Sequence, residues 1–106
     1  MKVASLKFIE KRAKSEEKPL AVFLIEKITP TIINNITSAD ITFYEDNNGQ
    51  PGNIITSFSA VLPTSQTQVS NKFNLPWYEV ELDLPNSVTL EGLPGGSKYW
   101  LGLYVY

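Results

Sequence analysis

Apolar and polar residues alternate with a period of two in several short segments after residue 19. The clearest segment is WYEVELDL, residues 77–84, in which Tyr78 and every second residue after it are apolar, whereas Trp77 and three acidic residues occupy the other positions. This alternation is typical of a strand with one buried face in an antiparallel sheet. We therefore predict a strand here that Pro85 and Asn86 bring to an end.

Turn residues separate this segment from others of strand-like composition. These are LAVFLIEKI (20–28), ADITFYE (39–45), NIITSFSAVL (53–62), the polar SQTQVSN (65–71), the start of SVTLEGLPGG (87–96) and SKYWLGLYVY (97–106). We expect the polar segment to form a sheet edge. Short strands separated by turns, with no helical pattern after residue 27, predict an all-β fold: a single antiparallel β-sandwich over residues 19–106.

Two of these segments predict particular buried faces. In 39–45 the alternation sets Ile41 and Phe43 on the opposite face from Asp40, Thr42 and Tyr44. In 53–62 the shared face consists of Ile54, Thr56, Phe58 and Ala60. We expect each strand to bury one of its faces.

The N-terminal segment SLKFIEKRAKSEEK has the signals of a helix. Ser5 is a good N-cap, Glu10 and Lys14 form a favourable i,i+4 pair, and Pro19 ends the segment. We therefore predict a short charged helix in residues 1–18. Its four lysines fall on one stripe, which indicates either attachment to an anionic surface or a solvated face. Because two glutamates dilute the positive charge, we favour the solvated face and do not expect membrane binding.

The composition excludes several kinds of chemistry. The 106 residues are enough for one small domain and include neither cysteine nor histidine. Disulfides, thiolate nucleophiles, Cys/His zinc sites and imidazole catalysis are therefore unavailable. Metals that prefer oxygen ligands, such as calcium, remain open. No apolar run approaches the ~20 residues of a transmembrane helix, and the chain as given has no recognisable signal peptide.

Charge is distributed unevenly along the chain. Residues 1–27 carry seven of the nine basic residues, whereas residues 28–106 carry two basic residues against seven acidic ones. An acidic body repels phosphate backbones, which are bound by clustered lysine and arginine. We therefore do not expect nucleic acid as a partner.

The stretch FYEDNNGQPGN, between two apolar segments, has two interpretations. The Asn-Gly pair at 48–49 and the Pro-Gly pair at 51–52 supply the backbone conformations that a turn requires. Alternatively, oxygen atoms of Glu45, Asp46 and Asn48 could bind calcium. Because the spacing differs from that of an EF-hand loop and the carboxylates are few, we favour the turn.

Two longer stretches carry a resemblance to a known module. ITFYEDNNGQPGNIITSFS (41–59) and WYEVELDLPNSVTLEGLPGGSKYWLGL (77–103) resemble a poorly characterised module of secreted bacterial surface and multidomain proteins. The resemblance implies a jelly-roll-like β-sandwich, an extracellular or cell-surface location and no established catalytic residues. Such modules usually have strands before and after the matched region. The resemblance therefore implies a truncated module in which residues 20–28 replace a missing strand, or in which a sheet edge is open to pairing with another chain.

The acidic face of segment 77–84 suggests one enzymatic hypothesis. Trp77 could serve as a sugar platform beside Glu79, Glu81 and Asp83, which could act as paired carboxylates in glycoside hydrolysis. All of these carboxylates are expected to be equally exposed, so none has an environment that would raise its pKa. We favour a solvated strand face and do not expect an enzyme.

The last segment carries an aromatic row. If its odd-numbered residues face the core, Trp100, Tyr104 and Tyr106 line the other face around Gly102. Such a row could stack on sugar rings or pack against a neighbouring domain or protein partner. We therefore expect a non-catalytic structural or adhesion-type module. The alternative is a carbohydrate-binding module that uses Trp77 or this row, and a small glycoside-acting enzyme is the third hypothesis.

Overall fold

The described part of the molecule is entirely β. The computed structural model describes the backbone of residues 3–11, 21–92 and 96–106 and the side chains of residues 23–71, 73–92 and 96–106. Its eight strands are β1 (Val3–Lys11), β2 (Ala21–Ile28), β3 (Thr31–Ile33), β4 (Ala39–Asn47), β5 (Gln50–Val61), β6 (Ser65–Lys72), β7 (Leu75–Gly92) and β8 (Ser97–Val105). These residues include no helix that is long and apolar enough to cross a membrane.

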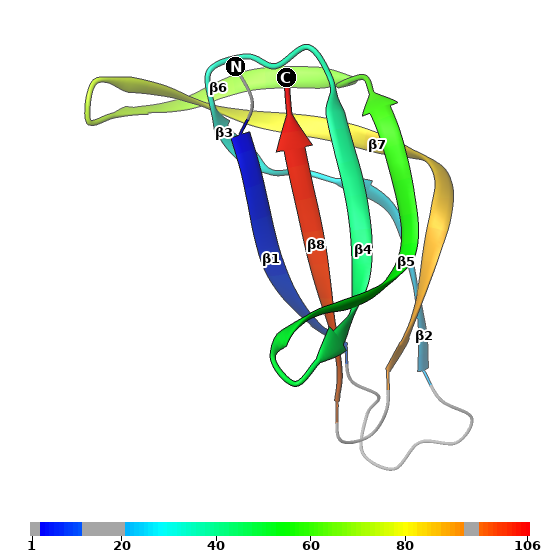
Figure 1. Ribbon diagram of the computed structural model, residues 1–106. Coiled ribbons are helices and arrows are strands. Elements are labelled where there is room, and N and C mark those ends of the chain that lie inside the picture. The colour runs from blue at the N-terminus through cyan, green and yellow to red at the C-terminus, as the bar shows by residue number, and fades with distance from the viewer. Residues whose placement is uncertain (1–2, 12–20, 93–95) are drawn as a thin grey trace.

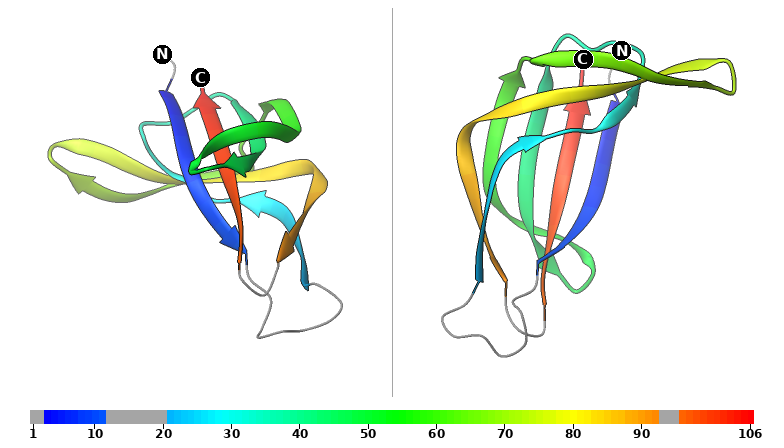
Figure 2. Two further views of the ribbon diagram at one scale, coloured as in Figure 1. Left: turned by 60° about the horizontal axis from the view of Figure 1, so that its bottom comes forward. Right: turned by 180° about the vertical axis from the view of Figure 1, so that it is seen from behind.

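The strands form two antiparallel sheets in a sandwich-like arrangement. The first sheet has the order β1-β8-β4-β5; the second has the order β2-β7-β3, with β6 paired to β7 as well (Figure 1). The long strand β7 runs behind the first sheet in Figure 1 and in front of it in the reverse view of Figure 2, and the β6–β7 hairpin extends beyond the first sheet. The hydroxyl of Tyr99 in β8 donates to the backbone carbonyl of Glu91 in β7 at 2.9 Å, which links the two sheets.

One apolar core lies between the sheets. Its largest fully buried side chains come from β4 and β7, and they are Phe43, Ile41, Leu82, Leu90 and Val80. Alternate residues of β8, namely Leu101, Leu103 and Val105, are buried in the same cluster. The faces predicted for segments 39–45, 77–84 and 97–106 are therefore confirmed.

The predicted N-terminal helix is wrong where the structure describes that segment. Val3–Lys11 is a strand that pairs with β8 at every position from Val3–Val105 to Lys11–Ser97. Local helix signals contribute only about 0.3–1 kcal/mol each, whereas an open sheet edge offers a continuous row of backbone hydrogen bonds. Residues 12–18 of the predicted helix lie outside the described residues.

Strand β7 continues beyond its predicted end. The prediction that Pro85 and Asn86 end it is wrong, because the strand extends to Gly92. Its register against β2 shifts between Ile25 and Lys27, so residues 84–87 bulge away from the regular ladder. A proline is tolerated at such a bulge because no ladder hydrogen bond is required of it.

The predicted face of segment 53–62 is also wrong. Phe58 is buried, but Ile54 and Ala60 are exposed. The register between β4 and β5 shifts at three places, and Ala60 has a φ of 54°. Each shift changes which residues face the core, so a strict period of two fails along this strand.

Candidate ligand-binding face

The outer side of the first sheet gathers aromatic and acidic side chains. Because β8 lies between β1 and β4 and buries every second residue, its remaining residues face outward. The register sets Tyr44 opposite Trp100 and Asp40 opposite Tyr104. We use the name aromatic face for Tyr44, Trp100, Tyr104 and Tyr106 together with Asp40 and Asp46.

A carboxylate from β4 holds the indole of Trp100. The Nε1–H group of Trp100 donates to Oδ1 of Asp46 at 2.9 Å. The same oxygen accepts the backbone N–H of Gly49 at 3.1 Å, within the turn that joins β4 to β5. The turn therefore fixes Asp46, and Asp46 fixes the Trp100 ring over the sheet.

The predicted turn is confirmed at Asn48–Gly49 but not at Pro51–Gly52, which lie in β5. Asn48 and Gly49 both have positive φ, 54° for Asn48 and 86° for Gly49, as a two-residue hairpin turn requires. Asn48 lies in this turn. Glu45 and Asp46 are consecutive on a strand and therefore leave it on opposite faces. Among the described residues, no three acidic side chains lie together as a metal site would require, and calcium binding stays a prediction.

A second carboxylate from β4 holds Tyr106. The Tyr106 hydroxyl donates to Oδ2 of Asp40 at 2.7 Å, and Oδ1 of Asp40 accepts the backbone N–H of Ala60 at 2.8 Å. The rings of Tyr104 and Tyr106 lie side by side, with centroids 5.8 Å apart and planes tilted by 48°. Their exposed fractions are 40 % and 38 %, so a large aromatic surface faces solvent.

Replacing Asp40 with asparagine should lower the pKa of Tyr106 toward its ordinary value of 10.0. The pKa of Tyr106 is raised chiefly by its hydrogen bond to Asp40, and further by desolvation and by the charges of Asp40 and Tyr104. The folded state favours the neutral phenol of Tyr106. The contribution of this group to the stability of the folded state is therefore complete below pH 10.0 and is lost as the pH rises through the raised pKa. NMR titration of the Tyr106 ring carbons measures the change, with Tyr106→Phe for assignment.

A carboxylate on the other sheet provides the control for this titration. Asp83→Asn removes the same charge from the outer side of the second sheet and should leave the pKa of Tyr106 unchanged. An unaltered Tyr106 titration in Asp40→Asn would contradict the role of Asp40.

Trp77 lies apart from the aromatic face. It belongs to β7, on the outer side of the second sheet, where it pairs with Ile33 of β3 and Ser70 of β6. Its ring is half-buried, and its buried Nε1 has no hydrogen-bond partner among the described residues. The structure therefore does not bring the two tryptophans into one site.

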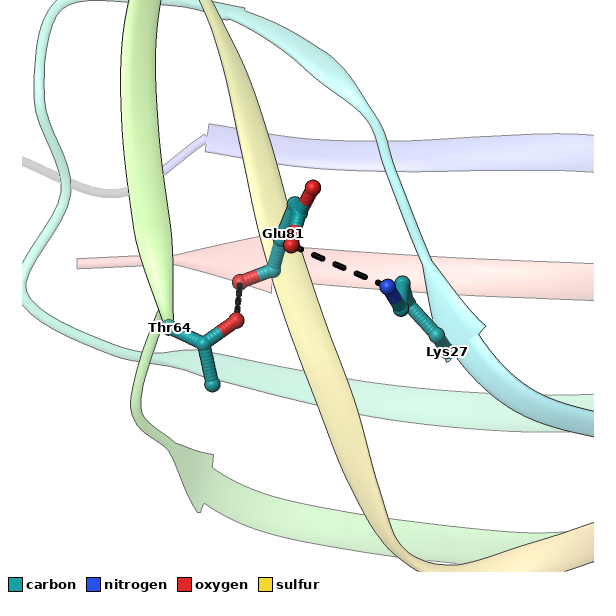
Figure 3. Close-up of polar contacts among 3 residues, drawn as sticks. All are labelled: Lys27, Thr64 and Glu81. Atoms are coloured by element: carbon teal, nitrogen blue, oxygen red, sulfur yellow. Dashed lines mark hydrogen bonds and ion pairs between the residues drawn. The ribbon is translucent and has the colours of Figure 1, made fainter.

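The carboxylates beside Trp77 lie on a solvated strand face. Lys27 forms an ion pair with Glu81, with Nζ and Oε2 3.7 Å apart, and the Thr64 hydroxyl donates to the Glu81 backbone carbonyl at 3.3 Å (Figure 3). Both charged side chains remain substantially exposed, so the pair contributes only about 0–1 kcal/mol. Glu79 and Asp83 are exposed as well.

An open pocket of about 380 Å³ lies where β7 bulges opposite β2. Its lining residues are Glu26, Lys27, Asp83, Leu84, Pro85, Asn86 and Ser87. A strand that ends at Pro85 does not predict this pocket, because the pocket is lined by residues on both sides of Pro85. The signal was present in the alternation, which continues after Pro85 with the buried Val88 and Leu90.

Sequence reasoning also missed the residues that hold the aromatic rings. It placed Asp40 and Tyr44 on the outward side of their strand, but it did not connect them with the last strand. That connection depends on the pairing of β4 with β8, which are separated by about half of the chain. No protein-family model, curated protein or solved structure matches this chain.

Proposed function

We propose that this chain is a non-catalytic, adhesion-type module with a jelly-roll-like β-sandwich fold. It binds carbohydrate on an extracellular surface through its aromatic face. The observation that carries the proposal is that two carboxylates of β4 hold two aromatic rings: Trp100 of β8 by its indole N–H, and Tyr106, directly after β8, by its hydroxyl. Rings held in this way offer a surface that loses little conformational entropy on binding. The resemblance to modules of secreted bacterial proteins supports the extracellular location.

The chemistry around Gly102 favours a sugar ligand. Gly102 leaves a position without a side chain between Trp100 and Tyr104 on β8. Opposite it on β4 is Thr42, whose hydroxyl lies 3.0 Å from that of Ser57. A sugar ring has apolar faces that stack on aromatic rings and hydroxyls that bond to polar side chains. Because Asp40 and Asp46 make this surface acidic, we expect neutral polysaccharides to bind better than anionic ones.

A second candidate function is the packing of the same face against a neighbouring domain. Trp100 is half-buried and lies opposite Tyr44, and the rings of Tyr104 and Tyr106 contact one another further along the same face. Large exposed apolar groups are typical of protein interfaces as well as of ligand sites. In that case the module would be structural, and no polysaccharide would bind.

Affinity gel electrophoresis with Trp100→Ala and Tyr104→Ala separates the two functions. Hydroxyethyl cellulose and xylan should retard the wild-type chain, whereas polygalacturonate should not. Removing a stacking ring should weaken binding by about tenfold or more. Trp77→Ala removes the other tryptophan from a different sheet and should bind like the wild type.

Two results would count against carbohydrate binding. One is unretarded migration of the wild-type chain with every polymer. The other is normal retardation of both Trp100→Ala and Tyr104→Ala. The Tyr104 variant is included because that side chain is the more exposed, so its loss should not disturb folding.

A further inference from the structure

The β6–β7 hairpin forms an arm that leaves the two-sheet body. The arm is the hairpin of residues 65–81; its base belongs to the body, since Val80 is buried in the core and residues 77–79 pair with β3, and its far end is the turn at Phe73 and Asn74. Both ribbon views show its tip well outside the rest of the molecule (Figures 1 and 2). At its base, the side-chain amide of Gln66 bonds to both the backbone N–H and the carbonyl of Ile36, at 2.8 and 3.0 Å. The body therefore fixes the direction of the arm.

The tip exposes a large apolar side chain in a strained conformation. Phe73 has a φ of 55° and is 87 % exposed. Bulky residues rarely adopt positive φ, and the turn itself would be formed more easily by Asn-Gly. No packing within the described residues compensates for this strain, since the ring faces solvent. Strain that is kept without an internal benefit indicates a contact outside the chain.

The outer edge of β6 is an open strand edge. Among the described residues β6 pairs only with β7, so its other edge presents backbone N–H and C=O groups. Edge strands commonly carry charged residues that prevent pairing with other chains. Residues 65–71 of β6 carry no charge, and Lys72 stands at the end of the strand.

Exposed apolar residues mark the same edge from end to end. Leu62 lies before β6, Val69 within it, and Phe73 directly after it at the turn. Val69 is the extra residue of a β-bulge, which re-aims its side chain, and it is 55 % exposed. A partner that covers this edge must therefore offer apolar contacts at the middle and at both ends.

We propose that two copies of this chain associate through their arms, by antiparallel pairing of their β6 edges about a two-fold axis at Val69. The axis sets Val69 against Val69 of the second copy. The same register sets Phe73 opposite Ser65 of the second copy, so the tip of each arm lies beside the base of the other, where Leu62 is exposed. Paired strands then form one sheet across the two molecules.

The charges and the symmetry favour a second copy over an unrelated strand. In this register Lys72 lies opposite Gln66, so no charge of β6 meets a like charge. A two-fold interface uses the same surface patch of both copies, so the patch must be complementary to itself. The apolar residues at the middle and both ends of β6 meet this condition. The aromatic face lies on the other sheet and remains open in the pair, so the proposal does not depend on carbohydrate binding.

Charge substitutions at the axis test the pairing. Sedimentation velocity should show a concentration-dependent rise of the wild-type mass toward twice the monomer value of 11.9 kDa. Val69→Lys and Val69→Glu each set like charges against one another and should raise the dissociation constant by about tenfold or more. An equimolar mixture of the two variants should associate again. Ile54→Lys is the matched control, because Ile54 is 63 % exposed on the other sheet, and it should behave like the wild type.

A single cysteine tests the position of the axis. Since the chain has no cysteine, Val69→Cys should form one disulfide between copies under mild oxidation, because opposite residues of paired strands lie within disulfide distance. Ile54→Cys should not cross-link to the same extent. A wild-type chain that stays monomeric up to about 1 mM, or lysine and glutamate variants that each associate as the wild type does, would overturn the proposal.

Discussion

Phe43→Ala should destabilise the protein by about 3–5 kcal/mol, the range for removing a buried phenylalanine ring. Phe43 is 0 % exposed and lies at the centre of the first sheet, paired with Leu101 of β8 on one side and Thr56 of β5 on the other. The substitution removes ring contacts with the core and leaves a cavity that the surrounding strands can fill only in part. Since small domains have a free energy of unfolding of about 5–15 kcal/mol, the variant should be close to unfolded at 37 °C.

Urea denaturation followed by circular dichroism measures this loss. Phe73→Ala is the control, because it removes the same ring from a position that is almost entirely in solvent. At low protein concentration it should change the free energy of unfolding by less than about 0.5 kcal/mol. If the two variants lost similar stability, the assignment of Phe43 to the core would be wrong.

The contrast between these two phenylalanines shows what the local pattern can predict. Phe43 follows a strict alternation with Ile41, and that alternation correctly identified the buried face of β4. The same rule worked for β7 up to Leu84 and for β8. Each of these strands has one face against the core, so the period of two is imposed by burial and is readable without knowledge of the partner strands.

The pattern failed where the register between strands shifts. Ile54 and Phe58 are four residues apart and should share a face, but the bulges in β5 expose the first and bury the second. Pro85 predicts the end of a strand, whereas it lies in a bulge within β7. A bulge depends on how two strands match one another, and the residues of one strand do not contain that information.

The candidate site was predictable only in part for a similar reason. The outward position of Trp100, Tyr104 and Tyr106 follows from the alternation in β8. Their fixation by Asp46 and Asp40 follows from the pairing of β8 with β4, which no local rule specifies. Trp77, the alternative sugar platform, belongs to the other sheet.

The N-terminal segment shows tertiary structure overriding local propensity. Ser5 and the pair Glu10–Lys14 favour a helix by contributions of about 0.3–1 kcal/mol each. Pairing with β8 instead satisfies a row of backbone groups over nine residues, and it covers an apolar strand that would otherwise be the edge of the sheet. The sequence of the segment does not reveal that such an edge exists.

Deletion of residues 1–11 should therefore abolish cooperative folding. The truncated chain loses β1, so β8 keeps β4 as its only neighbour among the described strands. Strand β8 contributes Leu101, Leu103 and Val105 to the core. With its edge open, this part of the core is exposed to solvent, and the strand can pair with other chains and aggregate. We expect a loss comparable with the whole free energy of unfolding, about 5–15 kcal/mol.

An amide ¹H–¹⁵N correlation spectrum distinguishes this outcome from that of a surface helix. The full chain should give dispersed peaks, and the truncated chain should give a collapsed or broadened spectrum. Adding a synthetic peptide of residues 1–11 should restore dispersion, because the peptide can add to the open edge of β8 as an antiparallel strand. A charged helix resting on the surface could be removed with little effect. A well-dispersed spectrum of residues 12–106 alone would therefore mean that the β1–β8 pairing contributes little to stability.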